Sequence, residues 1–512
     1  MIIAAVVVLL ALVGAPLFVI VGAVTAVAFA QYTDAVTALA DLKWVIDPFE
    51  ELMGKDQFIA IPLFVGAGAI MTEGGMARRL VDFGRALVGW LPGGLGIASV
   101  IACMGFAAIS GSSPVTLIAV GSIMFPAMVK AGYPERFSLG LVMTAGSLGC
   151  LMVPSLILMI YALAVGSTRA QVDAGDLFVA SYVPAGVVML FLWGYSFVVG
   201  LGIGSRETFS WRRLRDAFLD GVWALALPFL VFFGIRSGAF PPFKAGVVAF
   251  FYALAVTTLI HREIGLRKAF SILADAGRLM GILVLIIGLT FGLNKLFALV
   301  KVEDVIAGWV EPLGPVAFIL LVNVLLIVLG ALMDSVSATL VFAPILAPIA
   351  MAKGIDPIHF GIVFVVNMEI GYLAPPVATN LFVAAALFKK PFGQVSRAIL
   401  PGLALTTAAL VLFMFVPTLS KGLLNVARGD DVWEPFPWAG TPVGAGEARG
   451  ADLGAISDEA IDRTRDERKA LNEMGDDYYF SKEKAAAEDA GAGAADAGAA
   501  DAGEVNLDGV QL

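Results

Sequence analysis

The sequence predicts an all-α polytopic membrane protein with two repeats that contain re-entrant or broken helical hairpins. Hydrophobic residues make up 59% of the 512 residues and charged residues only 15%, whereas about a quarter of a soluble domain is charged. The apolar runs are continuous, as in "LMGILVLIIGLTFGL", which favours spanning helices over the short alternating segments of a β-barrel. Two stretches 222 residues apart also share their polar and helix-breaking positions.

The first apolar run, Ile2 to Ala30, is expected to be a retained first span. It has no basic region in front of it and is about twice as long as the core of a signal peptide. The next distinctive segment, Met76 to Gly94, carries Arg78, Arg79 and Arg85 on one helical surface. We expect it to lie along the membrane interface rather than across it.

The middle of the chain predicts a simple hairpin between two basic loops. The loops are 204–216 and 261–268, and the excess of arginine and lysine in them indicates the cytoplasmic side. Between them one apolar run leads out, "IRSGAFPPFK" turns, and a second run returns.

The repeat is carried by two interrupted apolar runs, "SGSSPV" at 110–115 and "MDSVSAT" at 333–339. In each copy an apolar run, a polar break, two further apolar runs and a second break with glycine and proline follow in the same order. The residues that match at an offset of 222 are Ser113 with Ser335, Pro126 with Pro348, Gly132 with Gly354, Gly149 with Gly371, and Pro154 with Pro376.

Paired interruptions in two halves of a chain indicate a transporter binding site, although glycine and proline are also common in ordinary membrane helices. A broken helix exposes carbonyl groups that can bind a cation and amide groups that can hold an anion. The candidate residues at the breaks are Ser110, Ser112, Ser113, Gly149 and Pro154 in the first copy and Asp334, Ser335, Ser337, Gly371, Pro376, Thr379 and Asn380 in the second.

Hard oxygen ligands without thiolates or imidazoles favour a hard cation such as Na⁺. Asp334 is an acid in an apolar run, which suggests ion binding, but it could instead pair with a basic residue or cap the helix after it. Glu369 could be an ion ligand, a proton carrier or a structural acid. Coupling to H⁺ would depend on Asp334 or Glu369.

The domain organisation follows from the same patterns. We expect a transporter domain at 1–420, with repeat 1 at about 57–204, scaffold at about 205–278 and repeat 2 at about 279–420. Residues 421–512 contain 20 acidic and 9 basic residues, a net charge of −11 against −9 for the whole chain. Their Ala/Gly/Asp-rich composition predicts a mostly disordered tail, solvated or, alternatively, docked on another surface.

Other function classes lack their residues. There is no phosphate-binding loop, dinucleotide fingerprint or HExxH motif, and only two histidines are present. We therefore expect no enzyme activity, no cofactor, no metal other than Na⁺ and no nucleic-acid partner. A membrane enzyme would need a nucleophile with its base, or metal ligands, near an interface.

Residues 1–420 resemble the large membrane subunit of TRAP (tripartite ATP-independent periplasmic) transporters, the DctM type. The matching stretches include "FIAIPLFVGAGAIMTEGGMARRLVDFGRALVGW", "SGSSPVTLIAVGSIMFPAMVKAGY" and "APILAPIAMAKGIDPIHFGIVFVVNMEIGYLAPPVATNLFVAA". One departure is Ala378 in "PPVATN", where this family would be expected to have glycine.

The resemblance implies an elevator-type transporter of the ion-transporter superfamily kind, in the bacterial inner (cytoplasmic) membrane. It implies a small membrane subunit (DctQ type) and a periplasmic substrate-binding protein (DctP type) as partners, besides membrane lipid. The substrate would be an organic anion, such as a C4-dicarboxylate or sialic acid, imported with Na⁺. The alternative is a self-sufficient symporter coupled to Na⁺ or H⁺.

By the same resemblance, the break residues divide into two sets. Those expected to bind Na⁺ are Ser110, Ser112, Ser113, Gly149, Pro154, Asp334, Gly371, Pro376 and Asn380. Those expected to contact the substrate are Ser112, Ser335, Ser337 and Thr379.

Overall fold

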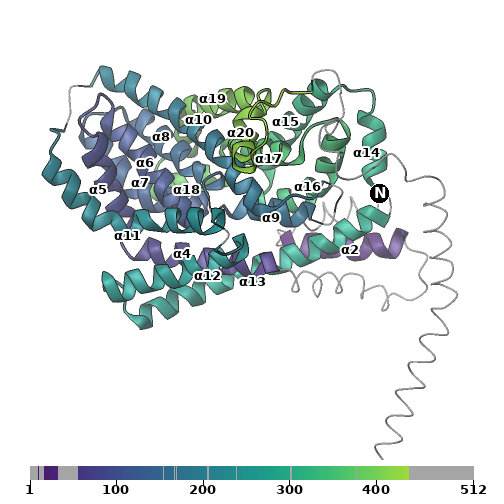
Figure 1. Ribbon diagram of the computed structural model, residues 1–512, viewed down its shortest axis with the longest axis horizontal. Coiled ribbons are helices and arrows are strands. Elements are labelled where there is room, and N and C mark those ends of the chain that lie inside the picture. The colour runs from purple at the N-terminus through teal and green to yellow at the C-terminus, as the bar shows by residue number, and fades with distance from the viewer. Residues whose placement is uncertain are drawn as a thin grey trace, which may run out of the picture. The chain divides into compact units, whose positions relative to one another are not determined.

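The computed structural model describes residues 10, 17–32, 56–153, 155–166, 168, 170–203, 207–237, 239–299, 302–375 and 378–437 (Figure 1). Within these ranges the chain is helical and contains no β-strand. Residues 1–443 form one compact unit, and the second unit, 444–512, lies outside the described residues. The predictions for the tail beyond residue 437 therefore also lie outside them.

The first part of the chain forms α2 (Leu17–Tyr32), α4 (Asp56–Glu73), α5 (Met76–Val88), α6 (Gly94–Ser110), α7 (Ser113–Lys130), α8 (Glu135–Ser147), the short 3₁₀ turn η1 (Leu148–Cys150), α9 (Leu156–Val165) and α10 (Ala174–Leu201). A hairpin follows, made of α11 (Trp211–Arg236), α12 (Pro242–Ala255) and a turn of π-helix, η2 (Val256–Ile260). This matches the out-and-back hairpin that the sequence predicts between the two basic loops.

The second part of the chain repeats the plan of the first. It forms α13 (Leu266–Leu299), α14 (Val302–Val310), α15 (Pro315–Leu332), α16 (Ser335–Ala352), α17 (Pro357–Leu373), α18 (Thr379–Phe388), α19 (Phe392–Met414) and α20 (Thr418–Arg428). Both ends of α16 lie 222 residues after those of α7, and α17 begins 222 residues after α8. The repeat inferred from a few serines, glycines and prolines is thus a repeat of helices.

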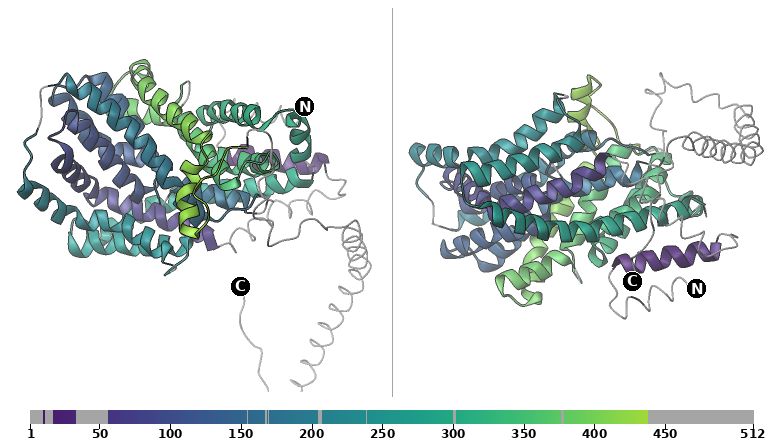
Figure 2. Two further views of the ribbon diagram at one scale, coloured as in Figure 1. Left: turned by 45° about the horizontal axis from the view of Figure 1, so that its top comes forward. Right: turned by 90° about the horizontal axis from the view of Figure 1, so that it is seen from below.

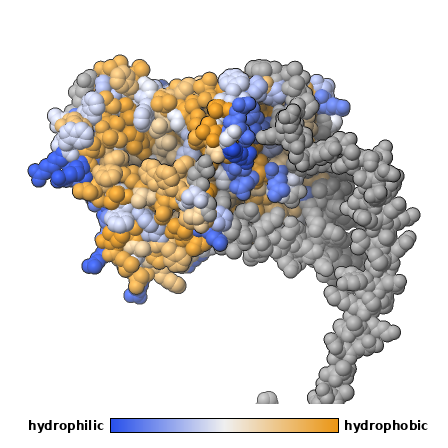
Figure 3. Space-filling view, viewed as in Figure 1, coloured by the Kyte–Doolittle hydropathy of each residue, from blue (hydrophilic) through white to orange (hydrophobic). Residues whose placement is uncertain are grey.

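Six described helices are long and apolar enough to cross a membrane. They are α7, α10, α11, α15, α16 and α19. Shorter apolar segments lie in α4, α6, α9, α12, α13 and α17. Figure 3 shows hydrophobic residues over most of the described surface on the side drawn there. Such a surface suits contact with lipid.

The two copies are interlocked by their short helices. Helix α9, which follows the second break of the first copy, packs against α16 of the second copy, and α18 packs against α7 of the first (Figure 1). Each broken segment is therefore covered by protein from the other copy. Seen from below, α4 lies between α12 and α13 (Figure 2).

Helix α5 brings the two basic loops to the same side of the molecule. Its Arg79 forms ion pairs with Glu263, at 2.6 Å, and with Asp220, at 3.3 Å. Arg85 reaches Glu207 at 2.7 Å. The helix is amphipathic, as predicted, and its buried face packs on α6 and α11.

The folded part continues past residue 421. The Lys421 ammonium is only 9% exposed and lies 2.7 Å from Asp356 and 2.8 Å from Glu434. Burial lowers the pKa of Lys421, but the two carboxylates more than offset this and raise it above the usual value. The predicted tail boundary at 421 therefore falls inside α20, because this lysine is buried as an ion pair instead of being solvated.

Replacing Lys421 tests this anchor. Lys421→Ala leaves Asp356 and Glu434 facing each other without their cation, and removing one partner of a buried pair costs about 3–5 kcal/mol. We expect a clear fall in the thermal unfolding temperature in detergent. Arg278→Ala is the matched control, because the Arg278–Asp275 pair is 81% and 67% exposed and such pairs contribute about 0–1 kcal/mol. Equal unfolding temperatures for the two variants would contradict the anchor.

Candidate functional site

The first break is a tight turn closed by hydroxyl groups. Helix α6 ends at Gly111, whose φ of 59° lies in the left-handed region that glycine adopts without strain. The Ser110 hydroxyl lies 2.9 Å from the Thr116 hydroxyl, and Thr116 Oγ1 donates to the Ser112 carbonyl at 2.9 Å. Oxygen atoms from three residues thus gather at the tip where α7 begins.

Gly149 closes the first site from the second break of the same copy. A Cβ at this position would lie 3.0 Å from the Ser112 carbonyl carbon and 3.1 Å from the Ser113 nitrogen. Only glycine allows the η1 turn to approach the tip so closely. The sequence-predicted pairing of Gly149 with the serine break is therefore a direct contact.

Asn380 of the second copy completes the site of the first. Its Nδ2 donates to the Ser113 hydroxyl at 2.5 Å. Its Oδ1 is buried and has no hydrogen-bond donor, which is unusual because buried polar atoms are nearly always paired. The fold thus brings together Ser110, Ser112, Ser113, Gly149 and Asn380.

The second break is organised differently. Asp334 precedes α16 and its Oδ1 accepts a hydrogen bond from the Ser337 nitrogen at 2.9 Å. This confirms the helix-cap alternative for Asp334, which does not by itself exclude a bound cation. The hydroxyls of Ser335 and Ser337 are buried without a partner. Among the described residues, no hydrogen bond joins these three residues to the first site.

The remaining predicted residues lie around the second break or outside the description. Gly371 packs against α15, where its Cβ would come 2.7 Å from the Gly330 Cα. Thr379 is the first residue of α18, but its side chain lies outside the described residues, as do Pro154 and Pro376.

The two copies differ where the helix restarts after the second break. In the first copy the Ser155 hydroxyl caps α9 by accepting a hydrogen bond from the Leu158 nitrogen at 3.3 Å. In the second copy Ala378 occupies this place with φ of 41° and no side-chain cap. The glycine that the family resemblance leads us to expect at this position would adopt that φ without strain.

Some polar residues in the same region were not among the sequence predictions. They are Thr116, Asn294, which donates to the Leu340 carbonyl at 3.1 Å while its Oδ1 stays unpaired, and Ser147, which contacts Glu369. Each is a polar residue inside an apolar run, and that isolation is the signal that could have identified them.

The arrangement suits ions rather than covalent chemistry. At each tip, hydroxyl and carbonyl oxygens sit beside the amino end of a helix, α7 or α16, where free amides favour an anion. The unpaired oxygens of Asn380, Ser335 and Ser337 could bind a hard cation. In the described part of the chain, no group of histidine, cysteine, aspartate and glutamate side chains could hold a transition metal.

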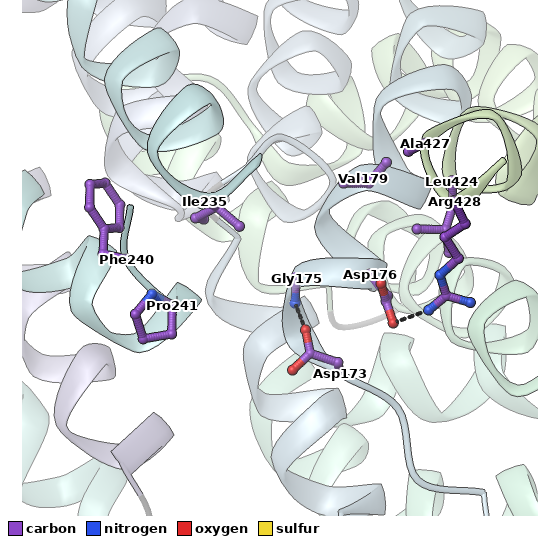
Figure 4. Close-up of a pocket in the computed structure, with 10 residues that line it drawn as sticks. All are labelled: Asp173, Gly175, Asp176, Val179, Ile235, Phe240, Pro241, Leu424, Ala427 and Arg428. Carbon is purple, nitrogen blue, oxygen red and sulfur yellow. Dashed lines mark hydrogen bonds and ion pairs between the residues drawn. The ribbon is translucent and has the colours of Figure 1, made fainter. Parts of the chain in front are cut away.

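A separate surface pocket of about 440 Å³ lies away from the breaks, between the start of α10, the α11–α12 turn and α20 (Figure 4). Arg428 crosses it to Asp176 at 2.5 Å, and Asp173 accepts from the Gly175 nitrogen at 2.7 Å. None of the predicted site residues lines this pocket. The ion pair fastens α20 to the first turn of α10.

Comparison with known proteins identifies relatives over most of the chain. The family model described as the DctM component of the tripartite ATP-independent periplasmic transporter matches residues 1–419. The C4-dicarboxylate TRAP transporter large permease protein DctM of Pseudomonas aeruginosa is 41% identical over 371 residues, which are 72% of this chain and 86% of that protein. Its Vibrio cholerae counterpart is 33% identical over 82% of this chain and 96% of that protein.

A more distant relative and a solved structure extend the comparison. The 2,3-diketo-L-gulonate TRAP transporter large permease YiaN of Escherichia coli is 32% identical over 72% of this chain and 86% of that protein. The crystal structure of the YdaH transporter of Alcanivorax borkumensis superposes with a TM-score of 0.52 and 14% identity, covering 81% of this chain and 98% of that one. This last likeness concerns the fold alone.

Ala378→Gly tests the strained restart of α18. A non-glycine residue in the left-handed region costs about 1–2 kcal/mol, so we expect this variant to unfold at a higher temperature than the unchanged protein. Ala374→Gly, at a residue with φ of −84°, is the control and should lower or leave the unfolding temperature. A fall in the Ala378→Gly variant would contradict the strain.

Gly149→Ala tests the close approach of the two breaks. The added methyl group would press on the Ser112–Ser113 backbone, and overpacking of this kind costs about 1–3 kcal/mol. We expect a lower unfolding temperature in detergent. Gly194→Ala is the control, because a Cβ at Gly194 in α10 meets nothing within 4 Å. An unchanged Gly149→Ala protein would show that the breaks do not touch.

Proposed function

This chain belongs to the DctM family of tripartite ATP-independent periplasmic transporters, a multi-pass protein of the bacterial inner membrane, and we propose that it is the large permease subunit of an organic-anion importer. One observation carries the proposal: in both copies a membrane helix is interrupted where buried oxygens and helix amino ends meet. The names of its relatives support small carboxylates, C4-dicarboxylates first, as the substrate class.

We propose Na⁺ as the coupling ion. Asn380 Oδ1 is a buried acceptor without a donor next to the Ser110 and Ser113 hydroxyls and the Ser112 carbonyl. A bound cation would supply what this oxygen lacks. At the second break, Asp334, Ser335 and Ser337 would provide oxygens for another ion, together with carbonyls near Gly371.

The substrate carboxylate would bind between the tips. Helices α7 and α16 begin at Ser113 and Ser335, and their first amides attract an anion. The hydroxyls of Ser112, Ser335, Ser337 and Thr379 would orient it. Sialic acid stays a possible cargo because it carries the same carboxylate group.

The transport cycle would use an elevator movement in which the interlocked hairpin segments move against the α11–α12 hairpin. A small membrane subunit of the DctQ type would steady this scaffold, and a periplasmic binding protein of the DctP type would deliver the anion. The second candidate is a self-sufficient symporter driven by Na⁺ or H⁺. Glu369, a fully buried acid, is the observation that keeps H⁺ in view.

Uptake in liposomes tests the proposal. The chain is reconstituted with the small subunit and binding protein from neighbouring genes, and uptake of radiolabelled succinate is measured. We expect uptake that stops when Na⁺ is replaced by K⁺ and when the binding protein is omitted. Uptake driven by a pH gradient without Na⁺ would contradict Na⁺ coupling, and uptake without the binding protein would favour the symporter.

Asp334→Asn separates the charge of Asp334 from its capping role. Asparagine caps helices as well as aspartate does, so we expect normal insertion and stability but a rise of at least about tenfold in the Na⁺ concentration for half-maximal uptake, equivalent to ~1.4 kcal/mol. Asp173→Asn, at the cap of α10, is the matched control and should behave as the unchanged protein. Equal Na⁺ dependence in both variants would remove Asp334 from the ion site.

A further inference from the structure

Ser147 and Glu369 occupy the same position in the two copies and touch each other. They are 222 residues apart, which is the repeat offset, and the Ser147 hydroxyl lies 2.7 Å from Glu369 Oε1. Two residues that are equivalent under the repeat can meet only at the axis that relates the copies. This pair therefore marks the centre of the interface between the two broken segments.

The Glu369 carboxyl group has no positive partner. Its side chain is completely buried, and Oε2 has no hydrogen-bond donor. Within the described ranges no lysine, arginine or histidine forms an ion pair with it. A buried carboxylate without a counter-charge costs several kcal/mol, so an ionised Glu369 would be poorly accommodated here.

The surrounding elements offer no compensating charge either. Helices α15, α16 and α18 carry no titratable side chain within their lengths, and the η1 turn presents only the Cys150 thiol. The charged residues of α8, α10, α19 and α20 belong to their end turns and have other partners. These are Glu135, Arg136, Asp176, Arg397, Lys421 and Arg428. On α17 itself His359 bonds to Ser420 and the Met414 carbonyl.

Hydrogen-bond geometry locates a proton on the carboxyl group. The Ser147 oxygen lies 2.8 Å from the Thr144 carbonyl and 2.7 Å from Glu369 Oε1. A hydroxyl has one proton to donate, and a carbonyl oxygen can only accept. If Ser147 donates to Thr144, its contact with Glu369 requires that Glu369 donate.

We propose that Glu369 is a proton-binding site, a neutral carboxylic acid whose O–H donates to Ser147, which in turn donates to the Thr144 carbonyl. This chain of two hydrogen bonds crosses from one copy to the other. The proton keeps the interface uncharged without a metal ion, so the site is distinct from the proposed Na⁺ sites and does not depend on them.

Infrared spectroscopy of the purified chain at neutral pH tests the protonation directly. A protonated acid in an apolar site gives a carbonyl stretching band that ionised carboxylates lack and that shifts in D₂O. We expect this band in the unchanged protein and its loss in Glu369→Gln. Glu311→Gln, which replaces a carboxyl group at an exposed residue, is the matched control and should keep the band. Absence of a band sensitive to Glu369→Gln would overturn the proposal.

The pH dependence of stability provides a second readout. The native protein holds a proton on Glu369 that an unfolded chain, with an ordinary glutamate, has lost by neutral pH. Stability therefore falls as the pH rises above the range where free glutamate titrates. We expect the unfolding temperature of the unchanged protein and of Glu311→Gln to fall from pH 6 towards pH 9 through this group, and the fall to be smaller in Glu369→Gln.

Transport separates a proton site from a cation site. Glutamine preserves the shape of the acid and can donate through its amide, so Glu369→Gln should import succinate within about twofold of the unchanged protein, with the same Na⁺ dependence. A rise of tenfold or more in the Na⁺ concentration for half-maximal uptake would mean that an ionised Glu369 binds Na⁺, and would overturn the proposal even if the proposed function stands.

Discussion

Every polar backbone group in the membrane must find a partner inside the protein, and the architecture depends on this constraint. Each break frees carbonyls and amides that lipid cannot hydrate. The chain answers by placing the short helix after each second break against the hairpin of the other copy, α9 on α16 and α18 on α7. The same covering that makes the breaks tolerable encloses the oxygens of Ser110, Ser113 and Asn380. Stability and ion binding therefore draw on one set of contacts.

The two copies share a plan but not their chemistry. Asn380 donates to Ser113, whereas Ile157, at the corresponding place on α9, cannot donate to Ser335, whose hydroxyl is left unpaired. Asp334 caps α16 with a carboxylate, whereas Ser112 offers α7 no side-chain cap. An inverted repeat needs such differences, because the two sides of a membrane present different ion concentrations. The pseudo-symmetric frame lets each tip be tuned separately.

Much of the frame was predictable because proline and glycine end helices for local reasons. The breaks, the repeat offset and the amphipathic α5 follow from such local signals. Asn380 was predicted as a site residue, but its pairing with Ser113 arises from packing between copies and has no local signature. Asp334 satisfied two hypotheses equally, since one carboxylate can cap a helix and bind an ion. The boundary at 421 was misplaced because Lys421 is charged, and only Asp356, 65 residues earlier, explains its burial.

The position of α20 has a topological consequence. Arg428 holds it to the first turn of α10, and the other end of that 28-residue helix leads to the basic loop at 207–216. A helix of this length spans roughly 42 Å, enough to cross the bilayer, so α20 lies across the membrane from the basic loop. If that loop is cytoplasmic, the chain leaves α20 on the outside. An acidic segment that begins there would contribute its negative charge to the extracytoplasmic surface, where a delivered anion would meet it first.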